Sequence, residues 1–257
     1  MSRIPEAFRA GKAFIPFITG GDPDLDTTEK LIYALNRAGA DAIEIGIPFS
    51  DPIAEGPVIQ AANMRSLAAG CTVEKLFDLA ARVRTGITTP LLFMTYYNPV
   101  FAYGVSRFTK RCAASGLDGL IVPDLPLEER QELLDPCLSE GLDLISLIAP
   151  TSESRIEKIA KSSGGFLYCV SSLGVTGERS ALDNNARRMV EQVKRVTDIP
   201  CAVGFGISTP EQARGIAEFA DGVIIGSAIV RIAAESGKEC EKAVFDFAQK
   251  VKQSISN

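Results

Sequence analysis

Residues 39–48 read GADAIEIGIP, a turn and an aspartate followed at once by a short apolar stretch. Two later segments repeat this arrangement, GLDGLIVPD at residues 116–124 and ADGVIIG at residues 220–226. The recurrence of a turn with Asp before an apolar stretch indicates a helix-to-strand junction repeated along the chain. Continuous apolar stretches of this kind are typical of parallel strands buried on both faces. The segments therefore predict an α/β fold with a parallel sheet.

Similar apolar stretches alternate with helical patterns from end to end. The predicted strands are Ala13–Thr19, Ala42–Ile47, Leu91–Tyr96, Gly119–Val122, Leu144–Ala149, Phe166–Val170, Ala202–Phe205 and Gly222–Ile225. The predicted helices are Thr27–Ala38, Val73–Arg84, Glu128–Glu140 with a kink or break near Pro136, Arg155–Ser162, Ala186–Val196 and Pro210–Phe219. Eight alternating strands in 257 residues predict one (β/α)8 TIM barrel over residues 1–257, with a doubly wound open sheet as the alternative.

Composition excludes several classes of function. The net charge is −5 with dispersed basic residues, and no apolar run is long enough to cross a bilayer, so we expect a cytoplasmic protein that binds neither nucleic acid nor membrane. The chain has no histidine, and its six cysteines show no CxxC spacing, so a metal site is not expected. We expect the cysteines to be small buried hydrophobes.

Glu44 is the first candidate for chemistry, because it lies inside a predicted apolar strand of a barrel. A buried carboxylate is costly unless it is paired or functional. Proton transfer at the mouth of the barrel is the favoured interpretation, and a structural side chain hydrogen-bonded to a neighbouring strand is the alternative. Glu55 follows in a loop that also holds Asp51, which places two more carboxylates near Glu44. Glu55 could divide acid and base roles with Glu44, or it could be a solvated surface group.

Glycines after the last two predicted strands indicate an anion site. Gly204 and Gly206 follow strand seven, and Gly226-Ser227 opens a short helical segment after strand eight. In (β/α)8 barrels, phosphate commonly binds at the loops after strands 7 and 8. The alternative is that these glycines only turn the chain. A further segment, Gly174–Arg179, has the composition of a mobile lid or of a plain loop.

The lysines fall in predicted helices, termini or helix-adjacent loops, so a Schiff base at the barrel mouth is not expected. With histidine absent as well, carboxylates are left to move protons.

Seven ordered segments together resemble the tryptophan synthase alpha subunit family. They are FIPFITGGDP (14–23), AIEIGIPFSDPIAEGPVIQAANMRSL (42–67), MTYYNPVFAYG (94–104), VPDLP (122–126), GVTGER (174–179), VGFGIS (203–208) and IIGSAIV (224–230). The resemblance implies retro-aldol cleavage of indole-3-glycerol phosphate to indole and glyceraldehyde 3-phosphate, without a cofactor in this chain. It implies that Glu44 handles protons and that Glu55, where the family usually has aspartate, accepts the indole N–H.

The resemblance also implies the remaining site residues. Those at the indole pocket or lid are Phe17, Tyr96, Tyr168 and Thr176, and those at the phosphate are Gly177, Phe205, Gly206, Gly226 and Ser227. Asp51, Asn98 and Pro126 match the face that meets a beta subunit, which would hold pyridoxal phosphate in an α2β2 complex. Because Glu55 departs from the family pattern, an impaired subunit that mainly activates its beta partner is an alternative. A sugar-phosphate isomerase is another.

Overall fold

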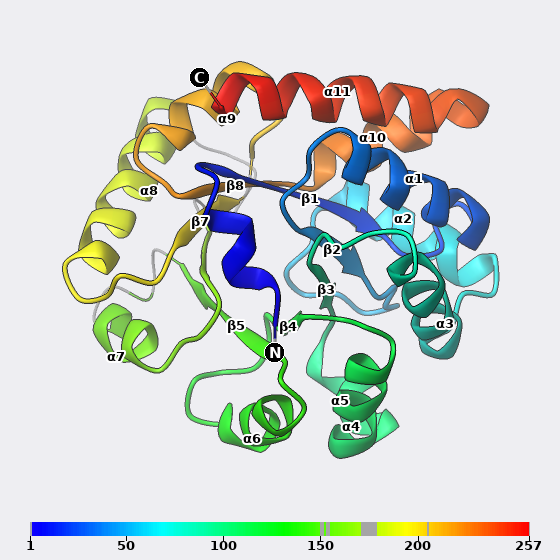
Figure 1. Cartoon of the computed structure of the whole chain (residues 1–257), viewed down its shortest axis with the longest axis horizontal. Coiled ribbons are helices and arrows are strands. Elements are labelled where there is room, and N and C mark those ends of the chain that lie inside the picture. Colours follow the sequence, from blue (N-terminus) through cyan, green and yellow to red (C-terminus); the bar gives the residue numbers. More distant parts are fainter. Residues whose placement is uncertain (1, 150–151, 153–154, 171–178, 205, 257) are drawn as a thin grey trace.

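The computed structural model describes residues 2–149, 152, 155–170, 179–204 and 206–256. Eight parallel strands follow one another around a closed barrel, in which β8 pairs with β1 (Figure 1). The strands are β1 (Ala13–Thr19), β2 (Ile43–Gly46), β3 (Leu91–Met94), β4 (Gly119–Ile121), β5 (Asp143–Ile148), β6 (Leu167–Val170), β7 (Cys201–Gly204) and β8 (Gly222–Ile225). The predicted (β/α)8 barrel is confirmed, and the open sheet is wrong.

Helices surround the barrel (Figure 1). Those predicted from the sequence are α1 (Leu25–Arg37), α3 (Val73–Arg84), α6 (Gln131–Ser139), α7 (Ile156–Lys161), α8 (Arg179–Lys194) and α9 (Pro210–Ala217). The others are α2 (Pro57–Ala68), α4 (Tyr97–Tyr103), α5 (Val105–Ala114), α10 (Ser227–Ser236), α11 (Cys240–Ile255) and the 3-10 helices η1 (Ile4–Phe8) and η3 (Gly237–Glu239). Helix α6 does not break at Pro136, which lies inside it.

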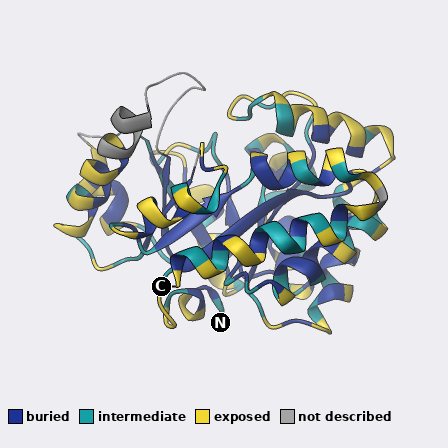
Figure 2. Ribbon diagram, turned by 90° about the horizontal axis from the view of Figure 1, so that it is seen from above, coloured by how far each residue is buried: buried dark blue, intermediate teal, exposed yellow. Residues whose placement is uncertain are grey.

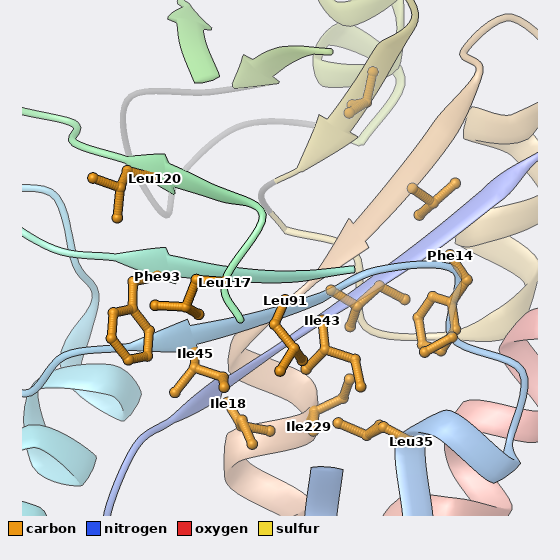
Figure 3. Close-up of a cluster of buried hydrophobic side chains, with 14 of the residues drawn as sticks. Phe14, Ile18, Leu35, Ile43, Ile45, Leu91, Phe93, Leu117, Leu120 and Ile229 are labelled. Atoms are coloured by element: carbon orange, nitrogen blue, oxygen red, sulfur yellow. The ribbon is translucent and has the colours of Figure 1, made fainter. Parts of the chain in front are cut away.

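Alternate residues of each strand serve two separate cores. In β2, Ile43 and Ile45 face the helices and pack in the cluster that also contains Leu35 of α1 and Ile229 of α10 (Figure 3). Ala42, one residue before β2, belongs instead to the cluster that fills the barrel. Figure 2 shows the strands buried beneath helices whose outer faces are exposed. All six cysteines are buried and form no disulfide bond, as the sequence predicted.

The repeated aspartates join neighbouring strands at the start of β2, β4 and β8. In each case the aspartate N–H donates to a carbonyl near the start of the preceding strand, and the N–H of that same residue donates back to the carboxylate. The pairs are Asp41 with Phe14, Asp118 with Leu91, and Asp221 with Cys201. Each carboxylate also meets a cation from a helix: Lys252, Arg84 and Lys194 respectively. The repeat seen in the sequence is therefore a structural joint.

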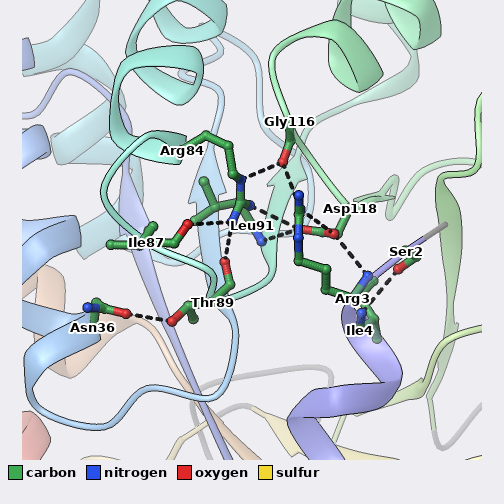
Figure 4. A network of polar contacts seen from close by, with 10 residues as sticks. All are labelled: Ser2, Arg3, Ile4, Asn36, Arg84, Ile87, Thr89, Leu91, Gly116 and Asp118. Carbon is green, nitrogen blue, oxygen red and sulfur yellow. Dashed lines mark hydrogen bonds and ion pairs between the residues drawn. The ribbon is translucent and has the colours of Figure 1, made fainter.

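The short helix η1 closes the end of the barrel where the strands begin. Its Ile4 and Ala7 are buried in the same cluster as the barrel interior, and η1 lies across the opening in Figure 1. Arg3, just before it, reaches Asp118 through both its backbone N–H and its guanidinium (Figure 4). The opposite end, where the strands finish, is therefore the end left for a site.

Candidate active site

Glu44 lies inside the barrel. It has the same orientation as Ala42 because side chains alternate along a strand, and it is in register with Phe17 of β1 and Leu92 of β3. Its side chain is completely buried. Neither of its carboxylate oxygens has a hydrogen-bond partner among the described residues, so the alternative of a structural side chain bonded to a neighbouring strand is wrong.

The charge state of Glu44 follows from this burial. Removing the carboxyl group from water disfavours its ionised form and raises the pKa of Glu44 to about 8. The pKa of the Tyr168 phenol in β6 is raised well above its ordinary value, first by burial and then by the charge of Glu44. The second cause shows that Tyr168 lies close to Glu44. At neutral pH the barrel therefore holds a protonated carboxylic acid, which is able to donate a proton.

Glu55 lies in the loop between β2 and α2, and three hydrogen bonds fasten this part of the loop. The N–H of Ala54 donates to the Tyr96 hydroxyl at 2.9 Å, and Gln60 Nε2 donates to the Glu55 carbonyl at 2.7 Å. Asn63 Nδ2 donates to Glu55 Oε2 at 2.6 Å. Burial raises the pKa of Glu55, and the Asn63 hydrogen bond opposes that rise. Glu55 is therefore a held, half-buried carboxyl group and not a solvated surface group.

A cavity of about 560 Å³ opens at the carboxyl ends of the strands. Glu55 and Tyr168 both line it, together with apolar side chains that include Met94, Pro123 and Leu147. Because Gly46 is in register with Met94, Glu44 lies one layer of side chains deeper in the barrel than the Met94 layer. The cavity is lined mainly by apolar side chains, with the carboxyl group of Glu55 at its wall, and Glu44 lies below without lining it.

Two glycines allow aromatic rings to pack closely against the barrel. A Cβ atom at Gly46 would lie 2.5 Å from Phe17 Cζ, and one at Gly204 would lie 2.6 Å from the Tyr168 hydroxyl. From the sequence, Gly204 was interpreted as a place where the backbone approaches a ligand. In the structure, the absence of a side chain at Gly204 makes room for the Tyr168 ring. Phe17 also lies against Gly226, so its ring extends from β2 to the turn after β8.

The turn after β8 presents a helix N-terminus. Gly226 is the N-cap of α10 and Ser227 is the exposed first residue, with no side chain capping the helix. The first N–H groups of a helix have no partner within it, and together with the helix dipole they attract anions. Gly206, after β7, is exposed and has a positive φ of 75°. None of these three residues lines the 560 Å³ cavity.

Some predicted site residues fall outside the described residues: Thr176, Gly177 and Phe205, with residues 174–178 of the predicted lid. The predicted partner residues Asp51, Asn98 and Pro126 are all exposed. They follow β2, β3 and β4, so they lie at the same end of the barrel as the cavity. Asp124 joins two of these loops by accepting the N–H of Tyr97 at 2.9 Å.

Two large apolar side chains are exposed in the same region, Ile53 of the β2–α2 loop at 80% and Phe101 of α4 at 63%. Sequence reasoning missed both, and it also missed Asn63 and the cavity-lining Met94, Pro123 and Leu147. Pro57 could have pointed to Asn63, because a proline is favoured in the first turn of a helix. A helix that begins at Pro57 carries Asn63 nearly two turns later.

Among the described residues, no group of three or more His, Cys, Asp or Glu side chains is arranged to hold a metal ion. No helix within the described part of the chain has the length and apolar character to cross a membrane.

Comparison with known proteins agrees with this geometry. The family model described as "Tryptophan synthase alpha chain" matches residues 6–256. Curated alpha chains are 48% identical in Lacticaseibacillus casei, over 99% of this chain and 96% of that one, and 49% identical in a Picosynechococcus species, over the full length of both.

Solved structures agree as well. The alpha subunit from Legionella pneumophila superposes with a TM-score of 0.90 at 36% identity, covering 99% of this chain and 98% of that one. A chain of the tryptophan synthase complex from Pyrococcus furiosus gives 0.86 at 36% identity, covering 95% and 98%. On its sequence and its fold, the chain belongs to the tryptophan synthase alpha chain family.

Proposed function

We propose that this chain cleaves indole-3-glycerol phosphate, the reaction of its family, with Glu44 moving the protons and Glu55 binding the indole N–H. The observation that carries the proposal is Glu44 itself: a fully buried carboxyl group without a hydrogen-bond partner among the described residues and with a pKa raised to about 8. A group with a pKa near the working pH is suited to both giving and taking a proton.

The reaction needs one proton given and one taken. Protonated Glu44 gives its proton to C3 of the indole, which places positive charge on the ring nitrogen. The resulting carboxylate takes the proton from the glycerol hydroxyl next to the ring. The bond from C3 to the glycerol chain then breaks, its electrons return to the ring, and the hydroxyl carbon becomes the aldehyde of glyceraldehyde 3-phosphate. Glu44 ends protonated as it began, so the step consumes no other reactant.

Glu55 stabilises the intermediate charge. Its carboxylate at the wall of the apolar cavity accepts the indole N–H, and that bond strengthens when the nitrogen becomes cationic. Phe17, Tyr96 and Tyr168 supply aromatic surface for the ring, with Thr176 assigned by resemblance alone.

The phosphate binds at the N-terminus of α10 through the N–H groups at Gly226 and Ser227, and Gly206 is assigned to the same site by resemblance. Gly177 and Phe205 complete the cradle by resemblance alone. Anchoring the phosphate away from the breaking bond orients the reacting atoms.

A beta subunit is the proposed partner, in an α2β2 complex in which only the partner holds pyridoxal phosphate. The exposed apolar side chains of Ile53 and Phe101 lie beside Asp51 and Asn98, with Pro126 on the next loop. Apolar side chains surrounded by polar residues are typical of a protein interface.

The test is release of glyceraldehyde 3-phosphate from indole-3-glycerol phosphate, with and without a beta subunit. Glu44→Gln should lower kcat about 10²- to 10⁴-fold, because an amide cannot transfer the proton. The exposed Glu157→Gln of α7 is the matched control and should leave kcat unchanged. An unchanged rate in Glu44→Gln would overturn the assignment.

The same assay tests the alternative of an impaired subunit. That alternative predicts that the chain stimulates condensation of indole with serine by the beta subunit but cleaves no indole-3-glycerol phosphate, and that Glu55→Asp restores cleavage. Family membership does not favour a sugar-phosphate isomerase, which would turn over an aldose phosphate.

A further inference from the structure

Glu55 has one side-chain partner among the described residues, Asn63. Asn63 lies in the middle of α2 and is only 2% exposed. Its Nδ2 is 2.6 Å from Glu55 Oε2, while Oε1 has no hydrogen bond to a described residue. The carboxyl group is thus held at one oxygen, and the other oxygen remains as an acceptor.

Helix α2 is fixed to the barrel close to Asn63. Two residues further on, Arg65 binds Asp22 of the β1–α1 loop through two hydrogen bonds of 2.8 Å. Ser66 donates to the carbonyl of Gly20 at 2.6 Å. On the preceding side, Ala62 is fully buried against Phe17 of β1. Helix α2 is therefore held to the barrel on both sides of Asn63, and this fixes the backbone from which the Asn63 amide reaches Glu55.

The backbone of Glu55 is held by other contacts. Gln60 binds its carbonyl, and Tyr96 binds the N–H of the residue before it. Asn63 is therefore not needed to place the loop, and its contact acts on the side chain. A glutamate has one more rotatable bond than an aspartate, so its carboxyl group has more orientations to lose when it is held.

We propose that Asn63 is a positioning residue that fixes the Glu55 carboxylate by binding Oε2, so that Oε1 accepts the indole N–H. The inference rests on the proposed role of Glu55. A donor aimed at the carboxylate also favours its ionised form. Burial raises the pKa of the Tyr96 phenol, and the charge of Glu55 raises it further, so Tyr96 is a titratable neighbour of Glu55. No described cation pairs with the Glu55 carboxylate.

Two variants test this in the complex with a beta subunit. Asn63→Asp keeps the shape of the side chain but replaces the donor with a carboxylate, and Asn63→Ala removes it. We expect both to lower kcat about tenfold or more, with KM changed less, because the phosphate contacts lie elsewhere. Both should shift the acid limb of the kcat profile to higher pH, because Glu55 then holds its proton longer. Gln60→Ala, which removes a contact to the Glu55 backbone, is the matched control and should leave that limb in place.

Binding provides a readout that survives loss of turnover. Calorimetry with a 3-alkylindole phosphate that lacks the glycerol hydroxyls gives Kd for the parent, Asn63→Ala, Glu55→Gln and the double variant. If Asn63 acts through Glu55, Asn63→Ala weakens binding in the parent by about threefold, less than it lowers kcat, and has almost no effect on binding when Gln is at position 55. Equal weakening in both backgrounds, or an unmoved acid limb, would overturn the inference. Full activity in Glu55→Gln would instead overturn the proposed role of Glu55.

Discussion

Asp118 and Leu91 bind each other twice at the start of β3 and β4. The Asp118 N–H donates to the Leu91 carbonyl at 2.8 Å, and the Leu91 N–H donates back to Asp118 Oδ2 at 3.0 Å. Arg84 and Arg3 contact the same carboxylate at 3.0 and 2.9 Å (Figure 4). Asp118 is 2% exposed, so one buried side chain joins two strands, a helix and the N-terminal segment.

Replacing Asp118 should therefore destabilise the whole barrel. In Asp118→Asn the mostly buried guanidinium of Arg84 loses its buried counter-charge, and we expect the free energy of unfolding to fall by about 3 kcal/mol. Urea denaturation followed by circular dichroism measures this loss. The control is Asp78→Asn, which removes an exposed ion pair with Arg111 and should cost less than about 1 kcal/mol. A similar small loss for both would show that the joint contributes little.

The buried Glu44 should make stability depend on pH. Unfolded Glu44 ionises near its ordinary pKa of 4.5, whereas the folded carboxyl group keeps its proton up to about pH 8. The unfolded state therefore releases a proton first as pH rises, and the folded state loses stability between these two values. Glu44→Gln cannot ionise, so its stability relative to the parent should rise by about 3 kcal/mol from pH 5 to pH 8. Urea midpoints at both pH values provide the test, and a constant difference would show that the pKa is not raised.

We expect that the Phe17 ring can keep its position only if residue 46 has no side chain. A Cβ atom there would lie 2.5 Å from the ring, so Gly46→Ala has to displace it. We expect kcat/KM for indole-3-glycerol phosphate to fall about tenfold or more and stability to fall by about 1–3 kcal/mol. Gly215→Ala in α9 meets no atom within 4 Å and should leave kcat/KM unchanged. Equal kinetics in the two variants would contradict a role for the Phe17 ring.

The exposed apolar side chains near the cavity should contribute to partner binding. Ile53→Ser and Phe101→Ser each remove a side chain that is more than half exposed in the isolated chain, and we expect each to raise Kd for a beta subunit about tenfold. Leu138→Ser is the control, because Leu138 is 61% exposed but lies at the end of α6 that leads into β5. Calorimetric titration distinguishes a specific interface from a general effect of lost apolar surface.

The strands could be predicted because each is a continuous apolar stretch buried on both faces. Helices α2, α4, α5 and α11 were not assigned, and for α2 and α4 the reason is physical. Helix α4 is short and carries the loop-like letters YNPVFAY. Helix α2 packs against both β1 and α10, so its apolar residues do not form one clear stripe. Pro136 did not end α6, because the packing of a helix on the barrel can outweigh a local preference.

Within the site, Glu44 could be predicted because an acid inside an apolar strand is a local signal. The contact between Asn63 and Glu55 could not, because it depends on how α2 turns back toward its own preceding loop. The same is true of Gly204, whose neighbour Tyr168 comes from another strand and is visible only once the barrel is closed.

Helix η1 closes the end of the barrel opposite the cavity of about 560 Å³. Substrate cannot enter, and products cannot leave, past Ile4 and Ala7, which fill the far end with buried apolar atoms. The aldehyde and the indole must then depart over the same rim by which their parent arrived. A protein that docks on this rim would therefore cover the end of the barrel at which substrate and products pass.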